Sequence, residues 1–156
     1  MENESGALSR VVGLFSARGY NIESLSVAPT DDDSLSRLTL VTRGSEQIVD
    51  QILKQLNKLL DVVKVMDLSD FQHIEREMML IKLEAKQTES IAMIKQIADV
   101  FRGKIIDLSH KTFTIEISGN SDKLDAFIEA MSEQTILEVV RSGCIGIARG
   151  NVALKI

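Results

Sequence analysis

The stretch Asn3-Glu4-Ser5-Gly6-Ala7-Leu8-Ser9-Arg10 decides how the first half of the chain is interpreted. Ser5 predicts a helix start, because its hydroxyl can accept a hydrogen bond from a first-turn N–H that has no helical partner. Gly6 has no Cβ, so a ligand or a second backbone can approach it closely. Exposed N–H groups at a helix start favour an anion such as a carboxylate. The stretch fits an ordinary capped helix or a binding loop, and the rest of the chain decides between them.

The composition indicates a folded protein and argues against nucleic-acid binding. The 156 residues are 44% hydrophobic and 4% aromatic, with a formal net charge of −5. A nucleic-acid-binding module would need basic and aromatic residues on a sheet face. The single cysteine, Cys144, excludes an intramolecular disulfide, and no apolar run approaches the roughly 18 residues of a membrane span. We expect one domain or two small ones, in the cytoplasm.

The first half predicts the order helix, strand, strand, helix, strand. A first helix is predicted over Ser5–Arg18 and ends at Gly19, with an apolar face made of Leu8, Val11, Val12 and Phe15. Two strands joined by a polar hairpin loop follow, then a helix capped by Ser45 and a short strand. The strands are Ile22–Ala28, Leu35–Arg43 and Val62–Met66, the loop is Pro29–Ser34, and the helix stripe is Ile48, Ile52, Leu56, Leu59 and Leu60.

The second half predicts a strand, a helix, a hairpin, a helix and a strand after a polar linker at Ser69–His73. The nearly continuous apolar run in Arg76–Ala85 is typical of a central strand covered on both sides. The other elements are helices over Thr88–Arg102 and from Ser121, and strands over Lys104–Ser109, Thr112–Ser118 and Thr135–Arg141. The glycine-rich segment of residues 142–150 is left unassigned.

The two halves repeat each other. Three residues recur 84 positions later, and three recur 76 positions later: Gly19, Ile22 and Glu23 match Gly103, Ile106 and Asp107, and Ser45, Ile48 and Ile52 match Ser121, Leu124 and Ile128. Each copy is a βαββαβ unit of the ferredoxin-like kind. The fold class is therefore α+β, with two tandem ferredoxin-like domains at 1–68 and 74–156. The first lacks its opening strand, since only Met1 and Glu2 precede the loop.

Catalytic and metal-binding patterns are not found in the sequence. His73 and His110 have no Cys, His or carboxylate at ligand spacing, and no phosphate-binding or nucleophile motif occurs. Cys144 has no identifiable base and is interpreted as a packed side chain. Glu75 and Glu77 at the head of a strand are expected to be solvated. The chain is predicted not to be an enzyme by itself, which favours a binding or regulatory role.

The residues resemble a known family over nearly the whole chain. The opening stretch, followed by Leu14-Phe15-Ser16 and Arg18-Gly19-Tyr20-Asn21-Ile22-Glu23-Ser24-Leu25, is similar to the small regulatory subunit of acetolactate synthase. Shorter matches extend the resemblance: Val27-Ala28-Pro29-Thr30, Phe101-Arg102-Gly103, Lys123-Leu124-Asp125 and Arg141-Ser142-Gly143.

The resemblance implies an N-terminal ACT domain, a homodimer formed through the ACT domains, and docking onto a catalytic large subunit. That subunit carries the cofactors thiamine diphosphate, Mg²⁺ and FAD, and none is expected in this chain. The family's small subunit activates the enzyme and confers feedback inhibition by a branched-chain amino acid, most often valine, in valine, leucine and isoleucine biosynthesis. The alternative reading is a free-standing ACT-type amino-acid sensor without an enzyme partner.

The resemblance also implies an effector site between two ACT domains. It assigns Asn3, Gly6, Ala7 and Leu8 of one protomer, and Asn21 and Ile22 of the other. Near the helix start, N–H groups can hold the effector carboxylate, an Asn carbonyl can accept from its ammonium, and Leu8 and Ile22 can line an apolar pocket. Ala28 and Gln51 match regulation-sensitive positions, as support rather than contacts.

One feature departs from the family pattern. Family members begin with an apolar central strand before the loop, and its loss removes two hydrogen-bonded ladders. Either the start codon lies upstream or the first domain is weakened. For the chain as given, we expect Val11, Phe15 and Ile52 to be exposed to water.

Overall fold

The computed structural model describes residues 1–85 and 87–155. Lys86 and Ile156, which fall within the predicted second domain, lie outside the described residues. The chain forms two compact units: residues 1–74 together with the segment from Ile145 on, and residues 75–144. The segment from Ile145 on therefore belongs with the first unit, whereas the sequence had been divided once, near residue 70.

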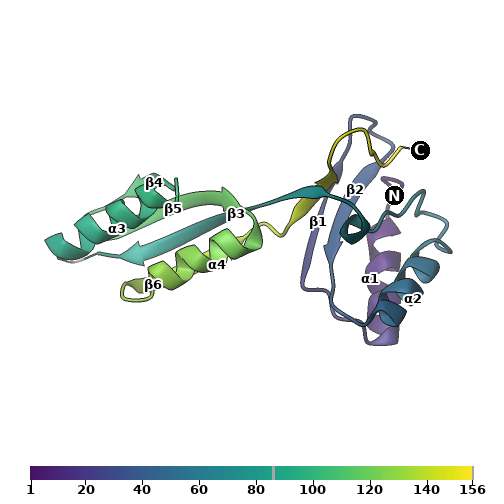
Figure 1. The fold of residues 1–156 in the computed structure, drawn as a ribbon, viewed down its shortest axis with the longest axis horizontal. Helices are drawn as coiled ribbons and strands as arrows, with labels where there is room; N and C mark the ends of the chain where they lie inside the picture. The colour runs from purple at the N-terminus through teal and green to yellow at the C-terminus, as the bar shows by residue number, and fades with distance from the viewer. Residues whose placement is uncertain (86, 156) are drawn as a thin grey trace. The chain divides into compact units, whose positions relative to one another are not determined.

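The first unit is a β-hairpin with two helices on one side (Figure 1). Strands β1 (Ser24–Pro29) and β2 (Ser36–Val41) pair antiparallel, with Ser24 opposite Val41 and Pro29 opposite Ser36. The other elements of this unit are α1 (Ala7–Arg18), α2 (Glu46–Leu56), the 3-10 turn η1 (Leu68–Asp70) and β7 (Ile145–Ala148). Strand β7 pairs with β3 (His73–Glu84), whose first two residues, His73 and Ile74, lie in this unit. The predicted order of helix, strand, strand and helix is confirmed, but the strand predicted at Val62–Met66 is wrong.

Residues 1–3 run beside the start of β2, in the position of the opening strand of the βαββαβ plan. The amide of Ser36 donates to the carbonyl of Met1 at 2.8 Å, and the amide of Asn3 donates to the carbonyl of Ser34 at 2.7 Å. On the other side, the amide of Glu2 donates to the carbonyl of Asp61 at 2.8 Å. Beyond these few bonds, no strand in the described chain pairs with the segment after Asp61. This explains why Val62–Met66 is not a strand.

The core of the first unit is nevertheless closed. Val11, Phe15 and Ile52, which were expected to be exposed, are only 1–4% exposed, so that expectation is wrong. Partly buried residues complete their cluster: Tyr20, Ile22, Leu38, Leu40, Leu56, Leu59 and Val62. Leu60, predicted on the helix stripe, is 96% exposed because α2 ends at Leu56.

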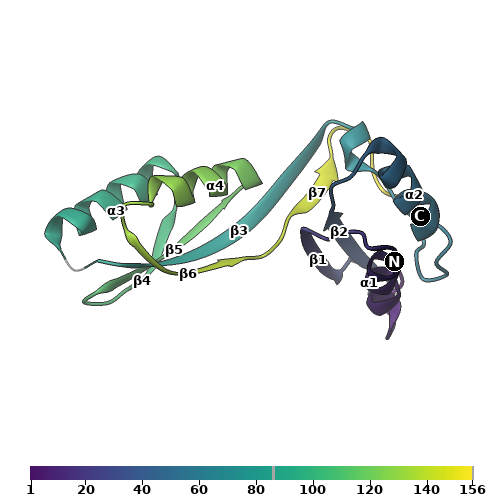
Figure 2. The same cartoon turned by 90° about the horizontal axis from the view of Figure 1, so that it is seen from below.

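The second unit is a complete ferredoxin-like sheet with α3 and α4 on one face (Figure 2). Its strands lie in the order β4-β5-β3-β6, with β3 and β5 in the middle. The elements are β3 (His73–Glu84), α3 (Thr88–Val100), β4 (Lys104–Leu108), β5 (Thr112–Gly119), α4 (Ser121–Ala130) and β6 (Thr135–Arg141). This order is the one that a βαββαβ unit gives, so the predicted fold class is confirmed.

The core of the second unit follows the strand alternation. Side chains at every second position of β3 and β5 face the helices and are buried: Met79, Ile81, Leu83, Phe113, Ile115 and Ile117. The helices contribute Ile94, Ala98, Leu124 and Phe127, as their spacing predicted. None of the described helices combines the length and apolar character that crossing a bilayer requires.

Candidate functional site

The first candidate site is the N-terminal loop, defined here as residues 3–6, which leads into α1. The helix starts at Ala7 with Gly6, not Ser5, as its N-cap residue, and no side chain caps it. Gly6 has φ +88°, a conformation that a glycine adopts without strain. The predicted helix start is therefore displaced by two residues, because the chain turns in the left-handed region at Gly6 rather than at a capping hydroxyl.

The side-chain amide of Asn3 is held from both sides by the β1–β2 hairpin. Its Nδ2 donates to the carbonyl of Asp33 at 2.9 Å, and its Oδ1 accepts from the hydroxyl of Ser36 at 3.0 Å. Ser36 is buried, with 6% of its surface exposed. Because an amide oxygen accepts two hydrogen bonds, Oδ1 keeps capacity for a further donor.

Ala7 and Leu8 differ in what they present. Ala7 is fully buried and its amide donates to the carbonyl of Glu4 at 3.2 Å, so its methyl group faces the core. Leu8 is half-buried at the surface of the first helical turn. Of this predicted pair, Leu8 is the one whose side chain remains available to a ligand.

Asn21 and Ile22 lie beyond the opposite end of α1. The helix has 12 residues, which at about 1.5 Å per residue gives a length of roughly 18 Å. Ile22 packs against the core cluster, and the carbonyl of Asn21 accepts from the Thr42 hydroxyl at 2.6 Å. One protomer therefore does not bring Asn21 and Ile22 together with the N-terminal loop.

The supporting positions also have places in the first unit. Ala28 is exposed on β1, opposite Arg37. Gln51 is exposed on α2, where its Oε1 accepts from the hydroxyl of Tyr20 at 3.2 Å. Neither contacts residues 3–6 through a hydrogen bond in the described part of the chain.

An ion pair beside the N-terminal loop was missed by sequence reasoning. The Arg10 guanidinium binds both carboxylate oxygens of Asp61, through Nε and Nη2, with the Nη2–Oδ1 distance 2.7 Å. The hydrogen bond from Arg10 lowers the pKa of Asp61, and the hydrogen bond to Asp61 raises the pKa of Arg10. The pair is therefore charged at neutral pH, and it weakens only when the pH falls through the lowered pKa of Asp61. Arg10 lies one helical turn after Gly6, but its partner is 51 residues away and gives no local signal.

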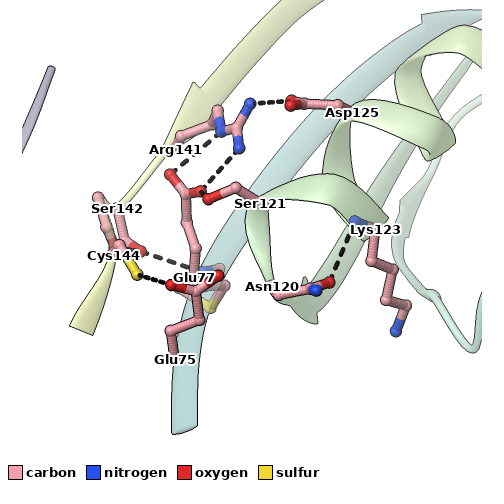
Figure 3. A network of polar contacts seen from close by, with 11 residues as sticks. Glu75, Glu77, Asn120, Ser121, Lys123, Asp125, Arg141, Ser142 and Cys144 are labelled. Carbon is pink, nitrogen blue, oxygen red and sulfur yellow. Dashed lines mark hydrogen bonds and ion pairs between the residues drawn. The ribbon is translucent and has the colours of Figure 1, made fainter. Parts of the chain in front are cut away.

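The second candidate site is a polar network at the end of β6 in the second unit (Figure 3). Arg141 donates from Nε and Nη2 to the two carboxylate oxygens of Glu77 at 3.1 and 2.7 Å, and from Nη1 to Asp125 at 2.6 Å. The hydroxyl of Ser121 donates to Glu77 at 3.5 Å. The hydrogen bonds of Arg141 to Glu77 and, less, to Asp125 raise the pKa of Arg141.

Glu77 is 6% exposed, so the expectation that it is a solvated strand end is wrong. Its position on β3 points toward α4, where Arg141 neutralises it. Cys144 is also buried, and burial raises the pKa of its thiol, which suits a packed side chain rather than a nucleophile. The network links β3, β6 and α4 through Glu77, Arg141 and Asp125, so we interpret it as structural.

The chain is similar to known proteins over almost its full length. The family model described as "AHAS small subunit-like ACT domain" matches residues 1–64, and the model described as "Small subunit of acetolactate synthase" matches residues 76–150. The acetolactate synthase small subunit of Haemophilus influenzae is 58% identical over 151 residues, which cover 96% of this chain and 92% of that protein.

Two further comparisons agree. The acetolactate synthase isozyme 3 small subunit of Escherichia coli is 50% identical over 156 residues, covering 99% of this chain and 95% of that protein. The crystal structure of the acetolactate synthase small subunit from Thermotoga maritima superposes with a TM-score of 0.85 at 38% identity, covering 97% of this chain and 94% of that one. The chain therefore belongs to the family of acetolactate synthase small subunits, the regulatory and non-catalytic subunits that work with a catalytic large subunit.

Proposed function

We propose that this chain activates the catalytic large subunit of acetolactate synthase and makes it sensitive to feedback inhibition by valine. The observation that carries the proposal is family membership across both units, together with a loop at the start of α1 that suits an amino acid. The large subunit would hold thiamine diphosphate, Mg²⁺ and FAD, and this chain would supply none of them. A free-standing sensor loses support, because the similarity covers nearly the full length of the small subunits compared here.

The N-terminal loop offers the three kinds of contact that an amino acid needs. Asn3 Oδ1 has room for a donor such as an ammonium group, and no side chain caps the helix start at Gly6, which suits a carboxylate. Leu8 offers a half-buried apolar surface for a branched side chain. A few polar groups around an apolar surface is the usual design of a small-molecule site.

A homodimer through the first unit would complete this site. Strand β1 pairs only with β2 in the described chain, so its other edge is available to a second copy. In an antiparallel pair about a two-fold axis, the start of one β1 lies beside the end of the other. The end of β1 leads into the hairpin loop that holds Asn3, and its start follows Ile22 by two residues. Such a dimer would bring Asn21 and Ile22 of the partner subunit toward the N-terminal loop.

The test is reconstitution of the full chain with its catalytic subunit. We expect the two chains to co-purify, and acetolactate formation to rise when the small subunit is added and to fall as valine is added. Failure of co-purification together with no effect on the rate would contradict the activating role. Activation without any response to valine, leucine or isoleucine would contradict the feedback role alone.

The placement of the effector is tested by Gly6→Asp with Gly13→Asp as a matched control. At Gly6 a Cβ would lie 3.1 Å from Arg10 Nη1 in a strained φ +88° backbone, and a carboxylate there would repel that of the effector. At Gly13, on the same helix, a Cβ meets nothing within 4 Å. We expect Gly6→Asp to abolish inhibition by valine and Gly13→Asp to preserve it. Equal inhibition curves for the two variants would place the effector elsewhere.

A further inference from the structure

The ion pair between Arg10 and Asp61 touches both ends of the N-terminal loop. Before the loop, the Glu2 amide donates to the backbone carbonyl of Asp61 at 2.8 Å. After it, Arg10 Nη1 lies against Gly6, where an added Cβ would be 3.1 Å away. Asp61 therefore contacts the chain just before the loop, and Arg10 contacts it at the end of the loop.

The pair is built for fixed geometry rather than for simple attraction. Two parallel hydrogen bonds between a guanidinium and a carboxylate define the orientation of both groups, which a single-point contact does not. The Asp61 side chain is 13% exposed and that of Arg10 is 51% exposed. Partial burial of the carboxylate limits screening by solvent and salt. The attraction between Arg10 and Asp61 is therefore stronger than that within a fully exposed surface pair.

Other contacts fix the outer side of the loop but not its turn. Asn3 is held by Asp33 and Ser36 of the hairpin. No side chain caps the helix start at Gly6. Within the described residues, the Arg10–Asp61 pair is thus the side-chain contact that ties the turn at Gly6 to the segment after α2.

We propose that Arg10 and Asp61 are positioning residues for feedback inhibition: their ion pair holds residues 3–6 in the conformation that receives the effector. This inference rests on the proposed function, since it concerns the same effector site. It assigns no contact with the effector to either residue. Loss of the pair is expected to leave the unit folded, because the core cluster of Val11, Leu14, Phe15 and Ile52 does not include it.

The experiment compares Arg10→Gln with Arg18→Gln in the full chain. Both arginines are on α1 and both link it to a residue in or after α2, since Arg18 Nη2 donates to Gln55 Oε1 at 3.0 Å. Only Arg10 lies beside the loop. We expect Arg10→Gln to raise the valine concentration for half-inhibition about tenfold, the effect of losing a charged hydrogen bond, and Arg18→Gln to leave it unchanged. Each curve is normalised to the uninhibited rate of the same variant.

Asp61→Asn provides a second, nearly isosteric variant, with Asp50→Asn as its control. Asp50 forms an exposed pair with Lys54 on α2 at 2.6 Å, away from the loop. Asp61→Asn keeps the backbone carbonyl that accepts from Glu2, so it removes only the charged contact. We expect the half-inhibiting valine concentration to rise for Asp61→Asn and to stay the same for Asp50→Asn.

Hydrogen exchange without effector separates this inference from the proposed function. We expect the amides of Glu2 and Asn3 to exchange about tenfold faster in Arg10→Gln and Asp61→Asn than in the two controls, while the amides of α2 are unchanged. If these amides are unchanged, or if half-inhibition is the same in variants and controls, the positioning role is wrong. A wild-type protein that ignores valine but shows the faster exchange in the variants would contradict the proposed effector and leave the loop-holding role supported.

Discussion

The two units share one βαββαβ plan and differ in whether its central strand is present. In the second unit β3 lies between β5 and β6 and pairs with β5 over Glu77–Glu84 and with β6 over Met79–Glu84. In the first unit the same position is filled only by residues 1–3, and the sheet that remains is a hairpin. The comparison shows which parts of the fold depend on that strand and which do not.

The burial of the apolar core depends less on the central strand than the backbone hydrogen bonding of the sheet does. The first unit buries Phe15 as completely as the second buries Phe127, because helix and hairpin side chains surround it. Its buried cluster has four described residues, however, against twelve in the second unit. The strand predicted at Val62–Met66 is lost as well, since a strand needs a neighbour for its backbone groups. An apolar cluster can thus form around two helices and a hairpin, whereas the ladder cannot extend without its middle strand.

The largest expected effect on stability comes from a substitution in the core of the second unit. Phe127→Ala should cost about 3–5 kcal/mol of unfolding free energy, the usual cost of emptying a well-packed aromatic site. Phe15→Ala should cost less, because its smaller cluster is bordered by partly exposed side chains that can collapse. Chemical denaturation followed by circular dichroism measures both, and the fluorescence of Tyr20, the single tyrosine, reports the first unit. A greater loss for Phe15→Ala would reverse our ranking of the two cores.

The next largest effect on the unfolding free energy concerns the Glu77–Arg141 ion pair of the second unit. Arg141→Met should cost about 2–3 kcal/mol, because it leaves the buried Glu77 carboxylate without its partner while some solvent remains accessible. The control is Lys82→Met on the same sheet, which breaks an exposed pair with Glu138 and should cost at most about 0.5 kcal/mol. Urea titrations of the two variants give the difference. Similar losses in both would mean that the Glu77–Arg141 pair is no more than a surface contact.

The smallest expected effect on stability concerns the ends of α1 and α3, which are similar in the two units. In both units a left-handed residue follows the helix and the next amide reaches back five residues: Gly19, directly after α1, with Tyr20 to Phe15, and Arg102, two residues after the end of α3, with Gly103 to Ala98. Gly19→Ala should destabilise the first unit by about 1 kcal/mol, and Arg102→Gly should stabilise the second by up to about 1 kcal/mol. Thermal unfolding of both variants measures the shifts. Shifts of the same sign would show that strain at these positions does not govern stability.

These helix ends also show how far the sequence could predict the fold. The repeat paired Gly19 with Gly103 and Ser45 with Ser121, yet the structure pairs Gly19 with Arg102 and Ser45 with Asn120. Each match is wrong by one residue. Glycine and serine are the usual residues at a left-handed helix end and at an N-cap, but in the second unit Arg102 and Asn120 occupy these two positions. Apart from the strand predicted at Val62–Met66, element type and order followed from the sequence pattern, as did the caps at Gly19 and Ser45. The corresponding positions in the second unit, Arg102 and Asn120, did not.

The candidate site was predictable only where its signal is local. The stretch from Asn3 to Arg10 identified the loop, whereas the packing of Ile22, predicted to line the effector pocket, against the core cluster was not foreseen. No local pattern indicates that Asp61 binds Arg10 or that Arg141 binds Glu77, because these partners are 51 and 64 residues apart. Such pairs depend on how the elements pack, which periodicity does not encode.

We predict that the first unit, whose sheet is a hairpin joined only by residues 1–3, is less stable than the second unit, whose central strand pairs on both sides. Native-state hydrogen exchange tests it most directly, because backbone amides in a full ladder are protected and those at an open edge are not. We expect low protection across β1 and β2, and high protection across β3 and β5. Adding an apolar strand of about 8 residues before Met1 should raise protection in the first unit and leave the second unchanged. Equal protection of the two units in the unextended chain would contradict this account.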